Sequence, residues 1–179
     1  MKTTQILIAG FGGQGILFSG KFLAYKGLME ELQVSWLPSY GPEMRGDTAN
    51  CNVILSDDPV GSPIIMSPDV LIAMNLPSLQ KYVNSVVTGG QIYVDSSLID
   101  VKVERDDLKV FYIPATQMAK DAGISTLANM IIIGHMLENN ANMSFDGVEG
   151  VVEKLVPPKK ESLKELNIKA LTLGKNYKN

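Results

Sequence analysis

Cysteine and histidine are almost absent from this sequence, which contains one of each among its 179 residues. A single cysteine cannot form a disulfide within the chain, and an iron–sulfur cluster or a cysteine-ligated zinc ion needs several thiolates. A single histidine also argues against a catalytic zinc site. The sequence therefore excludes a disulfide, an iron–sulfur cluster and a cysteine-based zinc site held by this chain alone, and it disfavours a catalytic zinc site.

The sequence also lacks a strong charge of either sign and a long apolar run. Its 16 lysines and arginines face 19 acidic residues, for a net charge of −3, which gives no electrostatic basis for nucleic-acid binding. No stretch is long and apolar enough to span a membrane. The apolar run at residues 6–9 is too short for a signal peptide. We therefore expect a cytoplasmic protein that binds neither nucleic acid nor membrane.

The usual signatures of catalysis are missing as well. The sequence shows no nucleophile beside a base, no cluster of metal-binding residues and no Walker lysine. Cys51 lies inside a strand-like segment, and we interpret it as a buried structural thiol. His135 lies in an almost wholly apolar helical pattern, where packing is the first interpretation and a catalytic role the second.

What the chain does have is a glycine-rich segment between a strand pattern at residues 4–9 and a helix pattern at residues 16–30. Its spacing fits GxGxxG. Such glycines let backbone N–H groups approach a phosphate, and the helix N-terminus adds a favourable positive potential. The alternative is a tight turn that only packs strand against helix. We predict cofactor-binding residues at Gly10, Gly12, Gly13, Gln14 and Gly15.

A second candidate segment, residues 39–47, is predicted to be a loop because Gly-Pro and Gly-Asp are turn signals. Arg45 can donate a bidentate fork to phosphate or carboxylate, and Glu43 can pair with it or position a polar ligand. We expect this loop to lie near the glycine turn, at the carboxyl ends of adjacent strands, where open α/β sheets bind ligands. Tyr40, Glu43 and Arg45 therefore join the candidate cofactor-binding residues; a solvated loop with a local ion pair is the alternative.

The end of the second predicted strand, residues 33–37, argues against NAD. In nicotinamide-binding folds this position usually carries an acid for the ribose hydroxyls. The residues here are Leu-Pro-Ser-Tyr, which include no acid.

Strand and helix patterns alternate along the rest of the chain, which predicts an α/β, Rossmann-like fold with a mostly parallel sheet flanked by helices. Further strands are expected at 48–56, 69–74, 91–95 and 109–113. Helices are expected at 76–87, up to Gly123, from a cap at Ser125 or Thr126 to 138, from a cap at Ser144 to 155, and after Pro157-Pro158. The polar end of the fifth strand, Asp95-Ser96-Ser97, faces the same crevice or caps a helix.

The helix at 125–138 is apolar nearly all round, which indicates burial in the core or against another subunit. The last helix has an apolar face of Leu163, Leu166, Ala170 and Leu173 and a basic face of five lysines. We interpret the basic face as solvated, with docking to an acidic partner as the alternative. A binding crevice without a catalytic centre leaves two hypotheses: a nucleotide-binding regulatory module that acts alone, or a non-catalytic subunit.

Three motifs taken together indicate a family more specifically than the GxGxxG spacing alone. Gly-Phe-Gly-Gly-Gln-Gly at 10–15, Ser-Tyr-Gly-Pro-Glu-Met-Arg-Gly at 39–46 and Thr-Ala-Asn-Cys at 48–51 resemble the gamma subunits of 2-oxoacid:ferredoxin oxidoreductases. Gly-Ser-Pro at 61–63 and Ala-Asn-Met-Ile-Ile-Ile-Gly at 128–134 also resemble that family. The similarity covers nearly the whole chain and implies one gamma-type domain over residues 1–179, with a C-terminal helical extension from about residue 157.

The resemblance implies a complex that oxidatively decarboxylates a 2-oxoacid, passes the acyl group to coenzyme A and sends electrons to ferredoxin. It favours 2-oxoglutarate, with branched-chain 2-oxoacids and indolepyruvate also possible. Thiamine diphosphate and iron–sulfur clusters would lie on alpha, beta and delta-type partner subunits. Coenzyme A is the implied ligand of the glycine turn. The hypothesis from a different class is a stand-alone adenine-nucleotide-binding regulatory module; in a third, the chain is a structural subunit whose glycine loop only packs.

Overall fold

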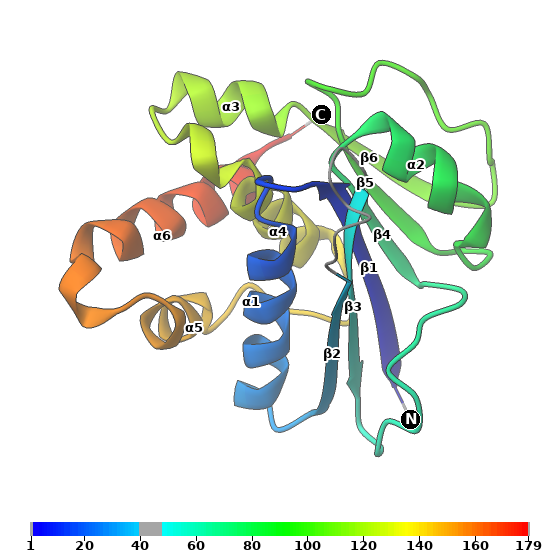
Figure 1. Ribbon diagram of the computed structural model, residues 1–179, viewed down its shortest axis with the longest axis horizontal. Helices are drawn as coiled ribbons and strands as arrows, with labels where there is room; N and C mark the ends of the chain where they lie inside the picture. Colours follow the sequence, from blue (N-terminus) through cyan, green and yellow to red (C-terminus); the bar gives the residue numbers. More distant parts are fainter. Residues whose placement is uncertain (1, 40–47, 179) are drawn as a thin grey trace.

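The computed structural model describes residues 2–39 and 48–178, which contain a six-stranded sheet in the order β2-β3-β1-β4-β5-β6 (Figure 1). The strands are β1 (Thr3–Phe11), β2 (Gln33–Ser39), β3 (Thr48–Ser56), β4 (Val70–Ala73), β5 (Gln91–Asp95) and β6 (Lys109–Ile113). Strands β1, β4, β5 and β6 run parallel. The expected mostly parallel α/β sheet is therefore confirmed.

Strand β3 is the exception, because it lies between β1 and β2 and runs antiparallel to both. Only residues 40–47 connect β2 to β3, and a parallel pairing needs a crossover of about a dozen residues or more. The short connection therefore forces β3 to reverse. Because β3 lies between them, the end of β2 is not next to β1. The position that supplies the ribose acid in nicotinamide-binding folds is therefore not beside the glycine turn.

Five helices cover one face of the sheet (Figure 1): α1 (Ile16–Met29), α3 (Ala115–Asp121), α4 (Ala128–Asn139), α5 (Val148–Leu155) and α6 (Glu161–Asn176). Helix α2 (Leu76–Tyr82) lies on the other face. The larger apolar core lies under the five helices, and a smaller one lies between β1, β4, β5 and α2.

Three predicted helix ends are wrong. The helix predicted to reach residue 87 ends at Tyr82 and continues as one 3₁₀ turn to Ser85. Ser144 does not cap α5, because its hydroxyl accepts the N–H of Asp146 within a local turn (3.0 Å), and α5 begins after Gly147. Neither Ser125 nor Thr126 caps α4, because residues 125–127 form a 3₁₀ turn ahead of the helix.

Helix α1 lies close to the sheet through its small residues. A methyl group at Gly20 would lie 2.1 Å from the sulfur of Cys51, and one at Gly27 would lie 2.5 Å from a methyl of Leu55. Cys51 is fully buried, and Nε1 of Trp36 donates to its sulfur (2.9 Å). Burial raises the pKa of the Cys51 thiol to about 12, against a smaller lowering by the Trp36 hydrogen bond. The interpretation of Cys51 as a structural thiol is therefore confirmed.

Helix α4 is buried from Ala128 to Leu137, and α6 crosses it at very short range. A methyl group at Gly134 would lie 2.0 Å from the carbonyl oxygen of Leu171, and one at Gly174 would lie 1.8 Å from that of Ile131. At this crossing, the most buried residues of α6 differ in part from the predicted apolar face. Leu163 is 38% exposed, whereas Asn167, Leu171 and Gly174 are buried with Ala170.

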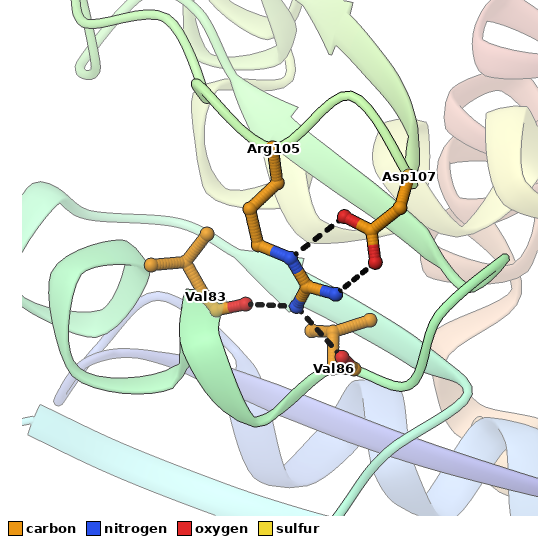
Figure 2. Close-up of polar contacts among 4 residues, drawn as sticks. All are labelled: Val83, Val86, Arg105 and Asp107. Atoms are coloured by element: carbon orange, nitrogen blue, oxygen red, sulfur yellow. Dashed lines mark hydrogen bonds and ion pairs between the residues drawn. The ribbon is translucent and has the colours of Figure 1, made fainter.

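On the opposite face, Arg105 fastens the loop before β6 to the end of α2 (Figure 2). Its Nη1 donates to the carbonyls of Val83 (3.0 Å) and Val86 (2.7 Å), and its other nitrogens form a bidentate pair with Asp107. The pair raises the pKa of Arg105 and lowers the pKa of Asp107. A guanidinium thus satisfies carbonyls at a helix C-terminus, a position that favours cations.

Candidate functional site

The glycine turn lies at the carboxyl edge of the sheet, between the start of β3 and the end of β4. Phe11 is opposite Thr48, and Ala9 is opposite Ala73. The turn runs from the end of β1 to Gly15, the residue before α1. The backbone of Gly15 has a left-handed conformation (φ 76°). The strand–turn–helix context predicted for the GxGxxG spacing is therefore confirmed.

The side chain of Gln14 holds the turn together from the inside. Its Oε1 accepts the N–H of Phe11 (2.6 Å), and its Nε2 donates to the carbonyl of Met74 just after β4 (3.0 Å). Its amide therefore joins the end of β1 to the end of β4. Gly10 provides the room for this arrangement, because a methyl group there would lie 2.6 Å from the Gln14 oxygen.

Gly12 and Gly13 differ from the other glycines of the turn. Both are exposed, and no atom lies within 4 Å of a methyl group built on either. None of the described residues accepts a hydrogen bond from the N–H groups of Gly12, Gly13 or Gly15, and no side chain caps α1. The turn thus offers open space beside backbone donors at a helix N-terminus, which are the requirements for binding an anion.

The other predicted site residues, Tyr40, Glu43 and Arg45, lie outside the residues that the structure describes. The flanking residues are described. Ser39 is opposite Asn50, and Thr48 is opposite Phe11. Both flanking residues are therefore at the edge of the sheet where the glycine turn lies.

Asp95, at the end of β5, serves as a cap. Its fully buried carboxylate accepts the backbone N–H groups of Ser97 (3.1 Å) and Thr116 (3.3 Å) and the hydroxyl of Thr116 (2.5 Å). These bonds fix the start of α3. Of the two interpretations of Asp95-Ser96-Ser97, the structure supports capping and turn formation.

His135 packs in the core, as the first interpretation held. It is 3% exposed, its Nδ1–H donates to the carbonyl of Gly174 (3.1 Å), and Tyr93, Phe111 and Tyr177 meet its ring edge-on. Burial lowers the pKa of His135, and Lys178 lowers it further. The Gly174 hydrogen bond and Glu138 act in the opposite direction without reversing the shift.

Stability is expected to fall as the pH drops because of His135. The folded-state pKa is lowered from its usual value of 6.5, so below that pH the unfolded chain binds a proton that the folded chain does not. The effect grows until the folded-state pKa is reached. We expect the loss in free energy of unfolding between about pH 7 and about pH 5 to be larger for the native chain than for His135→Gln in urea titrations. Equal losses would contradict this expectation.

Three lysines of the predicted basic face of α6 have partners within the chain. Lys164 pairs with Glu161 (3.4 Å), Lys169 donates to the carbonyl of Ala122 (3.0 Å), and Lys175 lies over the ring of Phe145 (4.5 Å). These contacts engage part of the basic face within the chain, and docking of this face to an acidic partner stays a prediction.

Sequence reasoning missed the role of Asn129 in the site. This residue of α4 is buried, and its Nδ2 donates to the carbonyl of Gly15 (3.2 Å) and the hydroxyl of Ser19 (3.0 Å). The sequence signal that could have indicated this role was the amide of Asn129 near the start of a largely apolar helix.

Comparison with known proteins identifies the family. Residues 5–177 match the family model described as pyruvate ferredoxin/flavodoxin oxidoreductase. The chain belongs to this family. The resemblance predicted from the motifs is therefore confirmed.

Within the pyruvate ferredoxin/flavodoxin oxidoreductase family, the chain is similar to two proteins of Methanothermobacter marburgensis. It is 34% identical to ketoisovalerate oxidoreductase subunit VorA, covering 98% of this chain but only 37% of VorA. It is 35% identical to 2-oxoglutarate synthase subunit KorC, covering 96% of this chain and 94% of KorC. The chain thus matches KorC in length and corresponds to about a third of VorA.

Two solved structures share the fold. The gamma subunit of a keto/oxoacid ferredoxin oxidoreductase from Geobacter sulfurreducens has a TM-score of 0.80 at 31% identity, covering 96% of this chain and 95% of that one. The 2-oxoglutarate:ferredoxin oxidoreductase from Magnetococcus marinus, solved with 2-oxoglutarate, coenzyme A and succinyl-CoA bound, has a TM-score of 0.85 at 24% identity. That match covers 98% of this chain and 31% of the other.

Two other features bear on function. Among residues 2–39 and 48–178, no helix is long and apolar enough to cross a membrane. Over the same residues, no group of three or more histidine, cysteine, aspartate or glutamate side chains is placed to hold a metal ion.

Proposed function

We propose that this chain is the gamma subunit of a 2-oxoacid:ferredoxin oxidoreductase, with 2-oxoglutarate as the favoured substrate and residues 1–179 forming one domain. The similarity to KorC over nearly the full length of both chains carries this proposal. The named relatives are all subunits of oxidoreductases. They give no support to the stand-alone nucleotide-binding module.

We propose that the chemistry of the complex lies on partner subunits. One cysteine cannot hold an iron–sulfur cluster, so the clusters and thiamine diphosphate belong to alpha, beta and delta-type chains. Ferredoxin accepts the electrons from the assembled complex. This division of labour agrees with a chain that has a binding turn and no catalytic pair of its own.

The role that we assign to this chain is to contact coenzyme A, which accepts the acyl group in the complex. The uncommitted N–H groups of Gly12, Gly13 and Gly15 support a diphosphate site, because they lie at the N-terminus of the long helix α1. Gly10 and Gln14 shape the turn from within. Arg45, with Tyr40 and Glu43, would add contacts from the neighbouring segment.

The first test is a calorimetric titration of the purified chain with coenzyme A, using NAD as the control. Heat of binding with coenzyme A alone would support the proposal. Binding of NAD alone would overturn it. If neither binds, the same titration of the complex reconstituted with its partner subunits decides, and absence of saturable coenzyme A binding there would also overturn it.

Gly12→Val is expected to weaken coenzyme A binding without destabilising the fold. No atom lies within 4 Å of the added Cβ, so the side chain projects into the space that a diphosphate would occupy. In the assembled complex we expect the KM for coenzyme A to rise about tenfold or more with kcat nearly unchanged, which is the sign of lost ligand binding.

Gly61→Val provides the matched control, because Gly61 is equally open but lies outside the turn. It should leave both the KM for coenzyme A and the stability unchanged. If Gly12→Val impairs assembly while the KM for coenzyme A stays normal, the turn only packs, and the coenzyme A site lies elsewhere.

A further inference from the structure

The segment Ala128–Gly134 contacts the glycine turn through Asn129. Asn129, on the first turn of α4, is 3% exposed. Its side chain crosses to α1 and ends against Gly15. A residue 114 positions away in sequence thus contacts the last residue of the glycine turn.

The contact with Gly15 is both steric and polar. A methyl group at Gly15 would lie 2.5 Å from Nδ2 of Asn129 and 2.8 Å from its Cγ, so the amide fills the space that a side chain at position 15 would need. The carbonyl oxygen of Gly15 accepts from the N–H of Ser19 (2.9 Å), the hydroxyl of Ser19 (3.0 Å) and Nδ2 of Asn129 (3.2 Å). These donors fix the orientation of the peptide that starts α1.

Two amide side chains therefore hold the turn from opposite ends. Gln14 joins the end of β1 to the residue after β4. Asn129 joins Gly15 to α4 through the Gly15 carbonyl and the hydroxyl of Ser19. Between them, Gly12 and Gly13 have no neighbour within 4 Å of an added Cβ.

Stability alone is a poor reason for an amide at this position. The Oδ1 atom of Asn129 is buried, and no described residue bonds to it. A buried polar atom without a partner costs roughly 1–3 kcal/mol. An apolar side chain of similar size would avoid that cost. We therefore infer that the amide serves to fix the geometry of the turn.

We propose that Asn129 is a positioning residue, which keeps Gly15 in its left-handed conformation (φ 76°) and so aims the free N–H groups of the turn at a bound diphosphate. The effect on the ligand rests on the proposed coenzyme A site. The effect on the turn does not, because it follows from the contacts of Asn129 with Gly15 and Ser19.

The test compares Asn129→Leu with Asn167→Leu. Asn167 is also a buried asparagine with an unpartnered Oδ1, but its Nδ2 bonds only to the carbonyl of Leu163 within its own helix (2.7 Å). Ser19→Ala is a milder second variant, because it removes one partner of Asn129 and adds no volume. Three quantities are measured: the free energy of unfolding, the amide hydrogen exchange rate of Ser19, whose N–H donates to Gly15, and the KM for coenzyme A in the assembled complex.

We expect Asn129→Leu to speed exchange at Ser19 about tenfold, which corresponds to the loss of one net hydrogen bond. The KM for coenzyme A should rise with kcat little changed. Asn167→Leu should leave both at the native value, whatever its effect on global stability, and Ser19→Ala should raise the KM in the same direction by less.

The outcomes separate the two proposals. Unchanged exchange at Ser19 in Asn129→Leu would overturn the positioning role, whatever happens to coenzyme A. If Asn129→Leu fails to fold, unchanged amide exchange at position 19 in Ser19→Ala would overturn the positioning role, because that N–H donates to Gly15. Faster exchange with an unchanged KM would support the positioning of the turn and would overturn the coenzyme A site there.

Discussion

Gly174→Ala is expected to lower the free energy of unfolding by on the order of 3 kcal/mol, a large part of the roughly 5–15 kcal/mol typical of a domain. The added methyl would lie 1.8 Å from the carbonyl oxygen of Ile131 and 2.8 Å from the backbone nitrogen of His135. Backbone atoms cannot rotate away as a side chain can, so α4 and α6 must separate. Their separation would loosen the packing of the larger core. Gly134→Ala should behave alike, because its methyl would lie 2.0 Å from the carbonyl of Leu171.

Gly150→Ala is the matched control for these variants. Gly150 is also a helical glycine, but its added methyl would meet only the terminal methyl of Met29 (2.9 Å), which can move. Alanine is about 1 kcal/mol more favourable than glycine within a helix, so this variant should match or exceed native stability. Urea titration followed by circular dichroism measures all three. A Gly174→Ala chain as stable as Gly150→Ala would show that the helices do not cross at this distance.

The second large effect is expected at the contact between α1 and the sheet. In Gly20→Ala the new methyl would lie 2.1 Å from the sulfur of Cys51 and 2.9 Å from Nε1 of Trp36. The variant should lose about 2 kcal/mol of stability, because a well-packed core does not accept the extra volume without moving. The single tryptophan of the chain reports on this contact through its fluorescence.

Cys51→Ala should rescue Gly20→Ala. Removing the sulfur leaves a void where the new methyl can lie, so the double variant is expected to be more stable than Gly20→Ala alone. Cys51→Ala alone should be destabilised by the cavity. Such non-additivity is the mark of direct contact. Purely additive losses in a double-mutant cycle would contradict the close packing of α1 on β3.

Sequence reasoning located the glycine turn because two different periodicities meet there. An apolar strand pattern ends at Ala9, a helix pattern begins at Ile16, and the glycines between them have a recognisable spacing. The reversal of β3 could also have been predicted, since residues 40–47 are too few for a parallel crossover. The alternation of strands and helices alone does not reveal that β3 lies between β2 and β1.

Other features depend on contacts that no local pattern encodes. Of the predicted apolar face of α6, only Leu163 is exposed. Ala170 is buried, and Leu166 and Leu173 pack against the core as predicted. The close crossing was missed, because it is set by Gly134 and Gly174, which allow two backbones to meet. No local pattern pairs Asn129 with Gly15, because Gly15 lies in the glycine turn before α1, 114 positions away in sequence. Capping was likewise misplaced at Ser144, because the same hydroxyl can satisfy a turn as easily as a helix.

The close crossing of α4 and α6 also has a consequence for the order in which the chain folds during synthesis. Strand β1 pairs with β3 and β4, so the sheet can begin to form once Ala73 has emerged from the ribosome. Helix α4 follows, yet the helix that packs along it is not complete until Asn176. A nascent chain that ends at Leu155 therefore leaves the α6-facing side of α4 exposed to solvent, and it depends on rapid completion or on a chaperone to avoid aggregation.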